Sequence, residues 1–115
     1  MLLYLDAADP SPLHEQLVGG IRRAIAEGRC RPGDRLPPAK DLAEQLDVNA
    51  NTVLRALRQL RDEGLLEFRR GRGISVTDAA PAHAAVARAA AELDALARQH
   101  GYSRAELMSL IERLP

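Results

Sequence analysis

The sequence predicts a mainly α-helical fold with one small β-hairpin, followed by a tail of two helices. Apolar residues recur at three- and four-residue steps in five segments, which is the period of helices that bury one face. Apolar and polar residues alternate in two short segments between residues 66 and 76, which is the period of half-buried strands. Arginines and glycines separate these two segments, so we expect a flexible, positively charged turn between the strands.

The first predicted helix covers residues 12–27. Ser11 is the expected N-cap, because its side chain can accept a hydrogen bond from a free backbone amide, and Pro12 fits the first helical position, where no donor is needed. Gly28 can supply the left-handed turn that ends the helix. Residues 31–34 (RPGD) then predict a type II turn, with proline at its second position and glycine at its third. The apolar stripe of the helix consists of Leu13, Leu17, Val18, Ile21, Ala24 and Ile25.

Two short helices follow this turn. The first is predicted over residues 39–46, directly after two prolines. The second is predicted from the cap residue Asn49 to about Glu63, with Gly64 just past its end. Its apolar stripe consists of Val53, Ala56, Leu57 and Leu60. Two short helices separated by a few residues predict a helix-turn-helix, and the hairpin that follows makes the arrangement a winged helix.

The remaining residues predict a helical tail. Residues 79–81 (AAP) are interpreted as a linker, which divides the chain into a winged-helix domain over residues 1–78 and a tail over residues 79–115. One tail helix is predicted over residues 83–100, and a second one begins at the capping box SRAE (103–106). The tail is too short for a core of its own, so we expect it to pack on the first domain or on another chain.

Charge is distributed unevenly along a chain that is neutral overall. The 115 residues include 16 Lys and Arg against 16 Asp and Glu. Residues 51–76 contain six arginines against three acids, whereas the acidic and basic side chains of the first twenty residues are all acids. A case for nucleic-acid binding therefore depends on where the charges lie and not on net charge.

Several classes of protein are excluded. Cys30 is the only cysteine, so the chain can form no internal disulfide and lacks the spacing of a zinc site, which fits a reducing cytoplasm. The apolar start Leu2–Leu5 ends at Asp6 without a positive segment before it, so we expect neither a signal peptide nor a membrane span. The three histidines are far apart and no nucleophile lies in a recognisable motif, so we expect no metal, no cofactor and no enzyme activity.

The predicted helix over residues 49–63 presents polar groups on the face opposite its apolar stripe. At about 100° per residue, Asn51, Arg55 and Arg58 share this face. Amide and guanidinium groups match the edges of adenine and guanine in the major groove, whereas Lys40 and the arginines of the hairpin turn can contact phosphates or a narrow minor groove. The candidate DNA-binding residues are Lys40, Asn49, Asn51, Thr52, Arg55, Arg58, Arg69, Arg70, Gly71, Arg72 and Gly73.

Each of these features also has a purely structural interpretation. An exposed polar helix face can be merely solvated, and the turn glycines can serve backbone geometry alone while the arginines serve solubility. A winged helix can also be a protein-interaction or architectural module, and zero net charge keeps this alternative open. A preference for one inverted repeat over random duplex would distinguish a sequence-specific regulator from such a module.

The order of the motifs resembles one family. From about Ser11 to Val76 the chain is similar to the winged-helix domain of GntR-type bacterial transcription regulators. The segments that carry the resemblance are PGDRLP (32–37), DLAEQLDVNANTVLRAL (41–57), LRDEGLL (60–66) and RRGRGISV (69–76). The resemblance implies a DNA-binding regulator.

Three positions depart from the family pattern. Pro38 stands where members usually have serine, so a phosphate-contacting hydroxyl is lost. Lys40 replaces the usual arginine, which keeps the charge without the planar fork. His14 stands where many members have tyrosine. The resemblance therefore implies that backbone anchoring in this chain differs from that of the family.

The tail looks like that of the small YtrA-like subgroup, in which the two terminal helices dimerise. HGYSRAEL (100–107), LMSLIERL (107–114) and NANTV (49–53) carry this resemblance, which implies a repressor. We expect a homodimer on an inverted-repeat, double-stranded operator, because the symmetry of the protein matches that of the site. An unknown small-molecule effector would have to bind at the dimer interface or between tail and winged domain, and the sequence shows no pocket. The expected dimerisation residues are Val86, Leu93, Leu96, Leu107, Leu110, Ile111 and Leu114.

Overall fold

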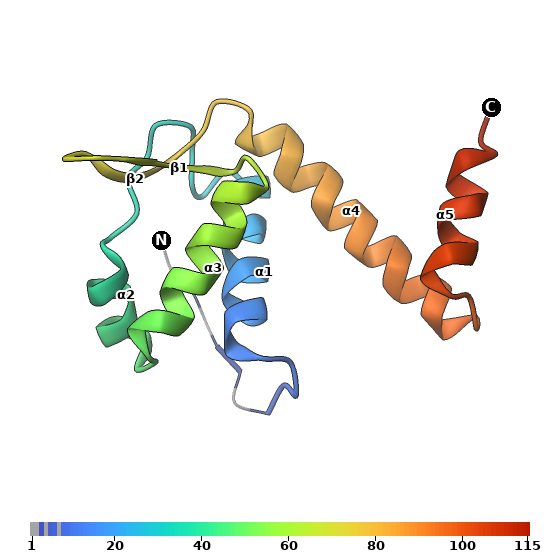
Figure 1. The fold of residues 1–115 in the computed structure, drawn as a ribbon, viewed down its shortest axis with the longest axis horizontal. Coiled ribbons are helices and arrows are strands. Elements are labelled where there is room, and N and C mark those ends of the chain that lie inside the picture. Colours follow the sequence, from blue (N-terminus) through green and yellow to red (C-terminus); the bar gives the residue numbers. More distant parts are fainter. Residues whose placement is uncertain (1–2, 4, 7) are drawn as a thin grey trace. The chain divides into compact units, whose positions relative to one another are not determined.

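The computed structural model describes residues 3, 5, 6 and 8–115, so the predicted apolar start lies outside the described residues at Leu2 and Tyr4. The described part is mainly α-helical with one hairpin, as predicted. It divides into two compact units, Met1–Ala85 and Val86–Pro115. The elements, shown in Figure 1, are α1 (Leu13–Ala26), α2 (Ala39–Leu46), α3 (Ala50–Asp62), β1 (Leu66–Arg69), β2 (Gly73–Val76), α4 (Ala80–Gln99) and α5 (Arg104–Glu112).

The core of the first unit is formed by the apolar faces of α1, α2 and α3. Helix α3 packs against both other helices (Figure 1). Its predicted stripe is confirmed, because all four members are completely buried, and each large one stabilises the fold by about 1.5–3 kcal/mol. Leu13 of the predicted α1 stripe is 42% exposed instead, since it is the first residue of its helix. The other α1 stripe residues are buried: Leu17, Val18, Ile21, Ala24 and Ile25.

The hairpin is antiparallel, and its register runs from Leu66 opposite Val76 to Arg69 opposite Gly73. A segment that the sequence did not predict as extended pairs with the other edge of β2. The Leu36 amide donates to the Ile74 carbonyl at 2.9 Å, and the Val76 amide donates to the Asp34 carbonyl at the same distance. Prolines on both sides keep this segment too short to show an alternating pattern.

The start of α1 differs from the prediction. Pro12, not Ser11, is the N-cap residue, and no side chain caps the helix. Gln16 organises this end, because its amide nitrogen donates to the backbone carbonyls of Ser11 and Asp6 and its oxygen accepts from the Asp6 amide. The first turn of α1 thus binds Asp6 and the Ser11 carbonyl through Gln16, and the Ser11 hydroxyl does not cap the helix.

The predicted linker at residues 79–81 is wrong, because α4 already begins at Ala80. Pro81 is tolerated there, since the first turn of a helix has no intrahelical partners for its amides. Ala80 and Ala84 are buried in the core of the first unit. The first turns of α4 therefore belong to the winged-helix unit, and the contact boundary lies between Ala85 and Val86.

The second unit contains the rest of α4 and α5. The predicted capping box is present: the Glu106 amide donates to the Ser103 hydroxyl, and the Ser103 amide donates to the Glu106 carboxylate at 3.0 Å. Asp94 of α4 accepts hydrogen bonds from Arg104 at 2.8 and 3.1 Å, and Arg98 lies 3.2 Å from it. The hydrogen bond from Arg104 is the main cause that lowers the pKa of Asp94 below its ordinary value. None of the described helices is long and apolar enough to cross a membrane.

Candidate nucleic-acid interface

The exposed face of α3 carries polar side chains that the core does not use. Asn51, Arg55 and Arg58 are all exposed, and they follow one another at four- and three-residue steps, which places them side by side on the helix surface. Thr52 is half-buried at the edge of this face. The structure therefore places the three predicted central residues together.

Asn49 has a structural task. Its side-chain oxygen accepts a hydrogen bond from the Asn51 amide at 2.8 Å, so it caps α3 as predicted. A cap of this type contributes about 1 kcal/mol to helix stability. Its side-chain amide group remains a donor at the exposed N-terminal end of the helix, where an anion is also favoured by the helix dipole.

The cations of this face have no acidic partner in the described part of the chain. Arg55 and Arg58 form no ion pair with any residue that the structure describes, and neither does Lys40, which is exposed in the first turn of α2. By contrast, Arg61 pairs with the neighbouring Asp62 at 3.2 Å, so the one acid on the outer face is already engaged. An uncompensated cation on a rigid helix is suited to binding an external anion.

The wing tip, residues 69–73, is a tight turn that requires its glycines. The Arg72 amide donates to the Arg69 carbonyl at 3.0 Å, and Gly71 and Gly73 have φ angles of 77° and 75°. Non-glycine residues rarely adopt these angles, so the structural interpretation of the two glycines is correct as far as backbone geometry is concerned. It does not account for three arginines in five residues.

These three arginines differ in their surroundings. The Arg69 Nε atom lies 3.3 Å from the Glu67 carboxylate on the same strand. Arg70 and Arg72 are exposed and form no ion pair within the described residues. Arg70 and Arg72 are thus the tip residues best able to bind phosphate, and Arg69 is partly neutralised.

Two contacts that the sequence did not predict fix α3 in the unit. Arg22 of α1 forms a forked pair with Glu63 at the end of α3, with 2.8 Å between Nε and Oε1, and Gln59 also donates to this carboxylate. On another side of α3, the Arg61 guanidinium lies 5.0 Å from the centre of the Phe68 ring in β1. Both contacts join side chains whose pairing has no local sequence signal. These contacts hold α3 to α1 and to the hairpin. Helix α1 therefore lies at one border of the exposed face of α3, and β1 lies at the opposite border.

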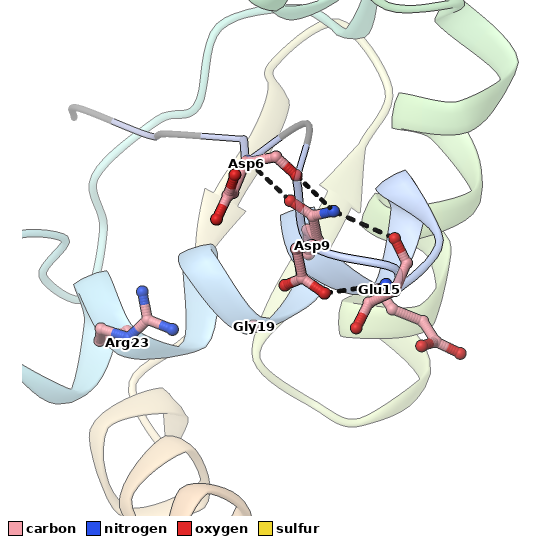
Figure 2. Close-up of a pocket in the computed structure, with 7 residues that line it drawn as sticks. Asp6, Asp9, Glu15, Gly19 and Arg23 are labelled. Carbon is pink, nitrogen blue, oxygen red and sulfur yellow. Dashed lines mark hydrogen bonds between the residues drawn. The ribbon is translucent and has the colours of Figure 1, made fainter.

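A polar cavity of about 410 Å³ lies on α1, on the side turned away from the core. Figure 2 shows its lining, which includes Asp6, Asp9, Glu15 and Arg23, with Gly19 at its base. The Ser11 amide donates to Asp9 at 2.8 Å, and this bond lowers the pKa of the Asp9 carboxyl. Three carboxylates repel phosphate, so this surface is unsuited to DNA.

Cys30 is buried, with 5% of its surface exposed. Burial raises the pKa of its thiol, which keeps it protonated and unreactive near neutral pH. No group of three or more metal-binding side chains is present among the described residues. Neither feature adds a chemical function to the surface of α3 and the wing tip.

The tail carries a second surface of interest. Six of the seven residues predicted to dimerise are exposed in the single chain, from 40% for Leu93 to 70% for Val86, whereas Leu107 is 7% exposed and buried within the tail. Large apolar side chains gathered on a short helical tail are typical of a surface that another chain covers. The exposed members are Val86, Leu93, Leu96, Leu110, Ile111 and Leu114.

The winged-helix unit matches a known family model. Residues 13–76 match the model described as "Bacterial regulatory proteins, gntR family". An HTH-type transcriptional regulator of Mycobacterium tuberculosis is 36% identical over 98% of this chain and 93% of its own length. The HTH-type transcriptional repressor YtrA of Bacillus subtilis is 33% identical over 67% of this chain and 59% of its own length. These relatives are named as transcriptional regulators, which confirms the prediction of a regulator and not an enzyme.

Solved structures agree with these relatives. YtrA from Sulfolobus acidocaldarius, described as a GntR-family transcription factor, has a TM-score of 0.63 and 31% identity over 79% of this chain and 99% of its own. The DNA-binding domain of AraR, solved in complex with operator ORX1, has a TM-score of 0.58 and 26% identity over 65% of this chain and 93% of its own. The winged-helix prediction and the resemblance to YtrA-like proteins are thereby confirmed.

Proposed function

The chain belongs to the GntR family of DNA-binding bacterial transcription regulators, and from this membership we propose that it is a repressor that binds an inverted-repeat operator as a homodimer. The observation that carries the proposal is the set of uncompensated cations on α3 and at the wing tip of a chain with no net charge. Such a set provides local attraction for a phosphate backbone, which a neutral protein otherwise lacks.

The exposed residues fall into two groups, one that would contact bases and one that would contact the DNA backbone. Asn51 and Arg55 lie in the first turns of α3, the part of a recognition helix that enters the major groove, and would read base edges. Arg58 lies one turn later and would contact either a base or the backbone. The remaining candidates would position the protein on phosphates and sugars: Lys40, Asn49, Thr52, Arg69, Arg70, Gly71, Arg72 and Gly73.

We assign DNA binding to the domain predicted over residues 1–78 and the homodimer to the tail predicted over residues 79–115, in which the exposed apolar residues all follow the boundary between Ala85 and Val86. The apolar side chains exposed on α4 and α5 support this assignment, because monomeric proteins rarely leave so much apolar surface uncovered on so short a segment. Leu107 would act from within the tail by holding α4 and α5 together. Two copies related by a two-fold axis would place two α3 helices in successive major grooves, about one helical turn apart.

Repression is the proposed sign of regulation. The similarity to the Bacillus subtilis repressor YtrA supports it, and a dimer that occupies a promoter in the cytoplasm would block initiation of transcription. An unknown small-molecule effector would bind at the dimer interface or between the tail and the winged domain.

Selection from a random pool tests the proposal. The purified full chain is incubated with random duplexes, the bound fraction is amplified over several rounds, and the enriched duplex is titrated against unrelated DNA at several salt concentrations. We expect an inverted repeat, bound by a dimer and resistant to competitor. Absence of any enriched sequence would overturn the proposal and favour an interaction or architectural module, the alternative that zero net charge supports.

A further inference from the structure

Leu54 is an apolar side chain on the helix that carries the candidate base-reading groups. It is half-buried, yet it belongs neither to the buried core of the described residues nor to the partly buried apolar residues packed against that core. The inward stripe of α3 is complete without it. The core of the described residues is therefore complete without Leu54.

The position of Leu54 on the helix surface is defined by its neighbours. Asn51 precedes it by three residues and Arg58 follows it by four, so both lie next to it on the surface, about 60° and 40° away around the axis. Arg61 lies within about 20° of Leu54 around the axis, and its guanidinium stacks on Phe68 of β1. Leu54 is thus on the border of the exposed face that is turned toward the hairpin, and not on the border that Glu63 and Arg22 join to α1.

The chemistry of the major groove provides one apolar partner for such a side chain. Each base pair presents hydrogen-bond donors and acceptors there, and only thymine adds a C5-methyl group. We propose that Leu54 packs against the C5-methyl group of a thymine in the operator half-site, between the base contacts of Asn51 and the backbone or base contact of Arg58. This inference depends on the proposed function, because it requires α3 to enter the groove.

The expected effect is that of one buried methyl group. Packing of such a group against a leucine strengthens binding about fourfold. The contact would add specificity where the polar groups of α3 add none, since a cytosine at the same position offers a hydrogen-bond donor and no methyl group.

Replacement of thymidine by deoxyuridine removes this methyl group and nothing else. The full chain is titrated against the duplex that it selects from a random pool, and then against duplexes in which each thymidine in turn is replaced by deoxyuridine. The same series is repeated with Leu54→Ala, with Leu54→Met and with Leu13→Ala. Leu13 is a matched control, because it is an exposed leucine at the start of another helix. Each variant is compared with itself on two duplexes, so a loss of folded protein affects both measurements alike.

We expect one thymidine in each half-site at which its replacement by deoxyuridine costs the wild type about fourfold in affinity. At that position, replacement of thymidine by deoxyuridine should not change the affinity of Leu54→Ala. The same replacement should cost Leu54→Met part of the fourfold loss and Leu13→Ala all of it. An undiminished loss in Leu54→Ala at every thymidine, no loss anywhere in the wild type, or a selected half-site without thymine would overturn this inference alone. Failure to select any sequence would overturn the proposed function as well.

Discussion

Arg55 stands on the exposed face of α3 without an acidic partner among the described residues. We predict that Arg55→Ala removes about 1–3 kcal/mol of discrimination between the operator and random duplex, which is the effect of one good bidentate base contact. Binding to random duplex should change much less. Competition titrations with the two duplexes measure the ratio directly. An equal loss on both would show that Arg55 contacts phosphate and not a base.

Arg70 differs from Arg55, because it lies in the turn at the wing tip, where glycines fix the backbone. No Asn or Gln side chain that could contact a base lies near it in sequence. We predict that Arg70→Ala weakens binding to all duplexes alike. The plot of log K against log salt should become less steep by about 0.9, the value for one phosphate contact. Glu67 pairs with Arg69, so Arg69→Ala should have the smaller effect of the two. A sequence-dependent effect of Arg70→Ala would point to minor-groove readout instead.

At the scale of elements, the Arg22–Glu63 pair holds α1 to the end of α3. Its side chains are 24% and 27% exposed, so the pair is less screened than a surface salt bridge, and its forked geometry adds hydrogen bonds. We predict that Arg22→Ala or Glu63→Ala lowers the free energy of unfolding by about 1–2 kcal/mol, as measured by urea denaturation. The exchanged double variant Arg22→Glu with Glu63→Arg should recover part of the loss. If the exchanged double variant loses as much free energy of unfolding as the two single exchanges together, packing is responsible and not the ion pair.

The tail has its own electrostatic link, in which Asp94 joins α4 to α5 through Arg104. The pKa of Asp94 is lowered in the folded chain, below the ordinary value of about 3.9. The stability that it contributes is therefore complete above this ordinary value and is lost as the pH falls through the folded value. We predict that wild type has a higher Tm than Asp94→Asn at pH 7 and at pH 5, and that the gap closes below about pH 4.

Thermal denaturation of both chains between pH 3 and pH 7 measures this gap. Glu112→Gln is the control, since Glu112 is an exposed acid on α5 that forms no ion pair within the described part of the chain. It should have the same Tm as wild type throughout. A gap for Asp94→Asn that stays constant down to pH 3 would show that a change in packing causes it, and not the carboxylate charge.

The helices and the hairpin could be predicted because each has a local signal. The period of α3 identified four residues that are all completely buried, and Asn49 and Gly64 marked its ends. Features that depend on residues far apart in the sequence had no such signal. The pairing of Leu36 with Ile74 and the contact between Arg22 and Glu63 belong to this class.

The candidate interface followed the same rule. Exposure of Asn51, Arg55 and Arg58 follows from helix periodicity alone. That Arg69 is partly neutralised by Glu67, and that Leu54 lies outside the core, depends on the packed structure. Periodicity identifies which side of a helix is exposed, but it does not say which exposed groups are already satisfied.

For the whole molecule, the net charge is zero, but part of the charge is separated locally. Carboxylates line the cavity on α1 (Figure 2), whereas unpaired cations lie on α3 and at the wing tip. Long-range attraction to DNA is therefore weak, and the attraction grows only when the cationic surface approaches the duplex. A single chain with few phosphate contacts would bind weakly, and the proposed second copy on the same operator would strengthen binding.

The proposed second copy leads to the prediction for the tail. Leu93 is 40% exposed on α4 in the single chain, and a charge placed there would be buried without a partner in a dimer. We predict that Leu93→Asp converts the dimer into a monomer of 12.5 kDa by light scattering and that operator affinity falls by at least tenfold, because each half-site must then be bound alone. Leu13→Asp is the matched control, since Leu13 is 42% exposed and lies outside the tail; it should remain dimeric. If Leu93→Asp stays dimeric, another surface joins the two chains, and the exposed apolar residues of α4 and α5 have a different partner.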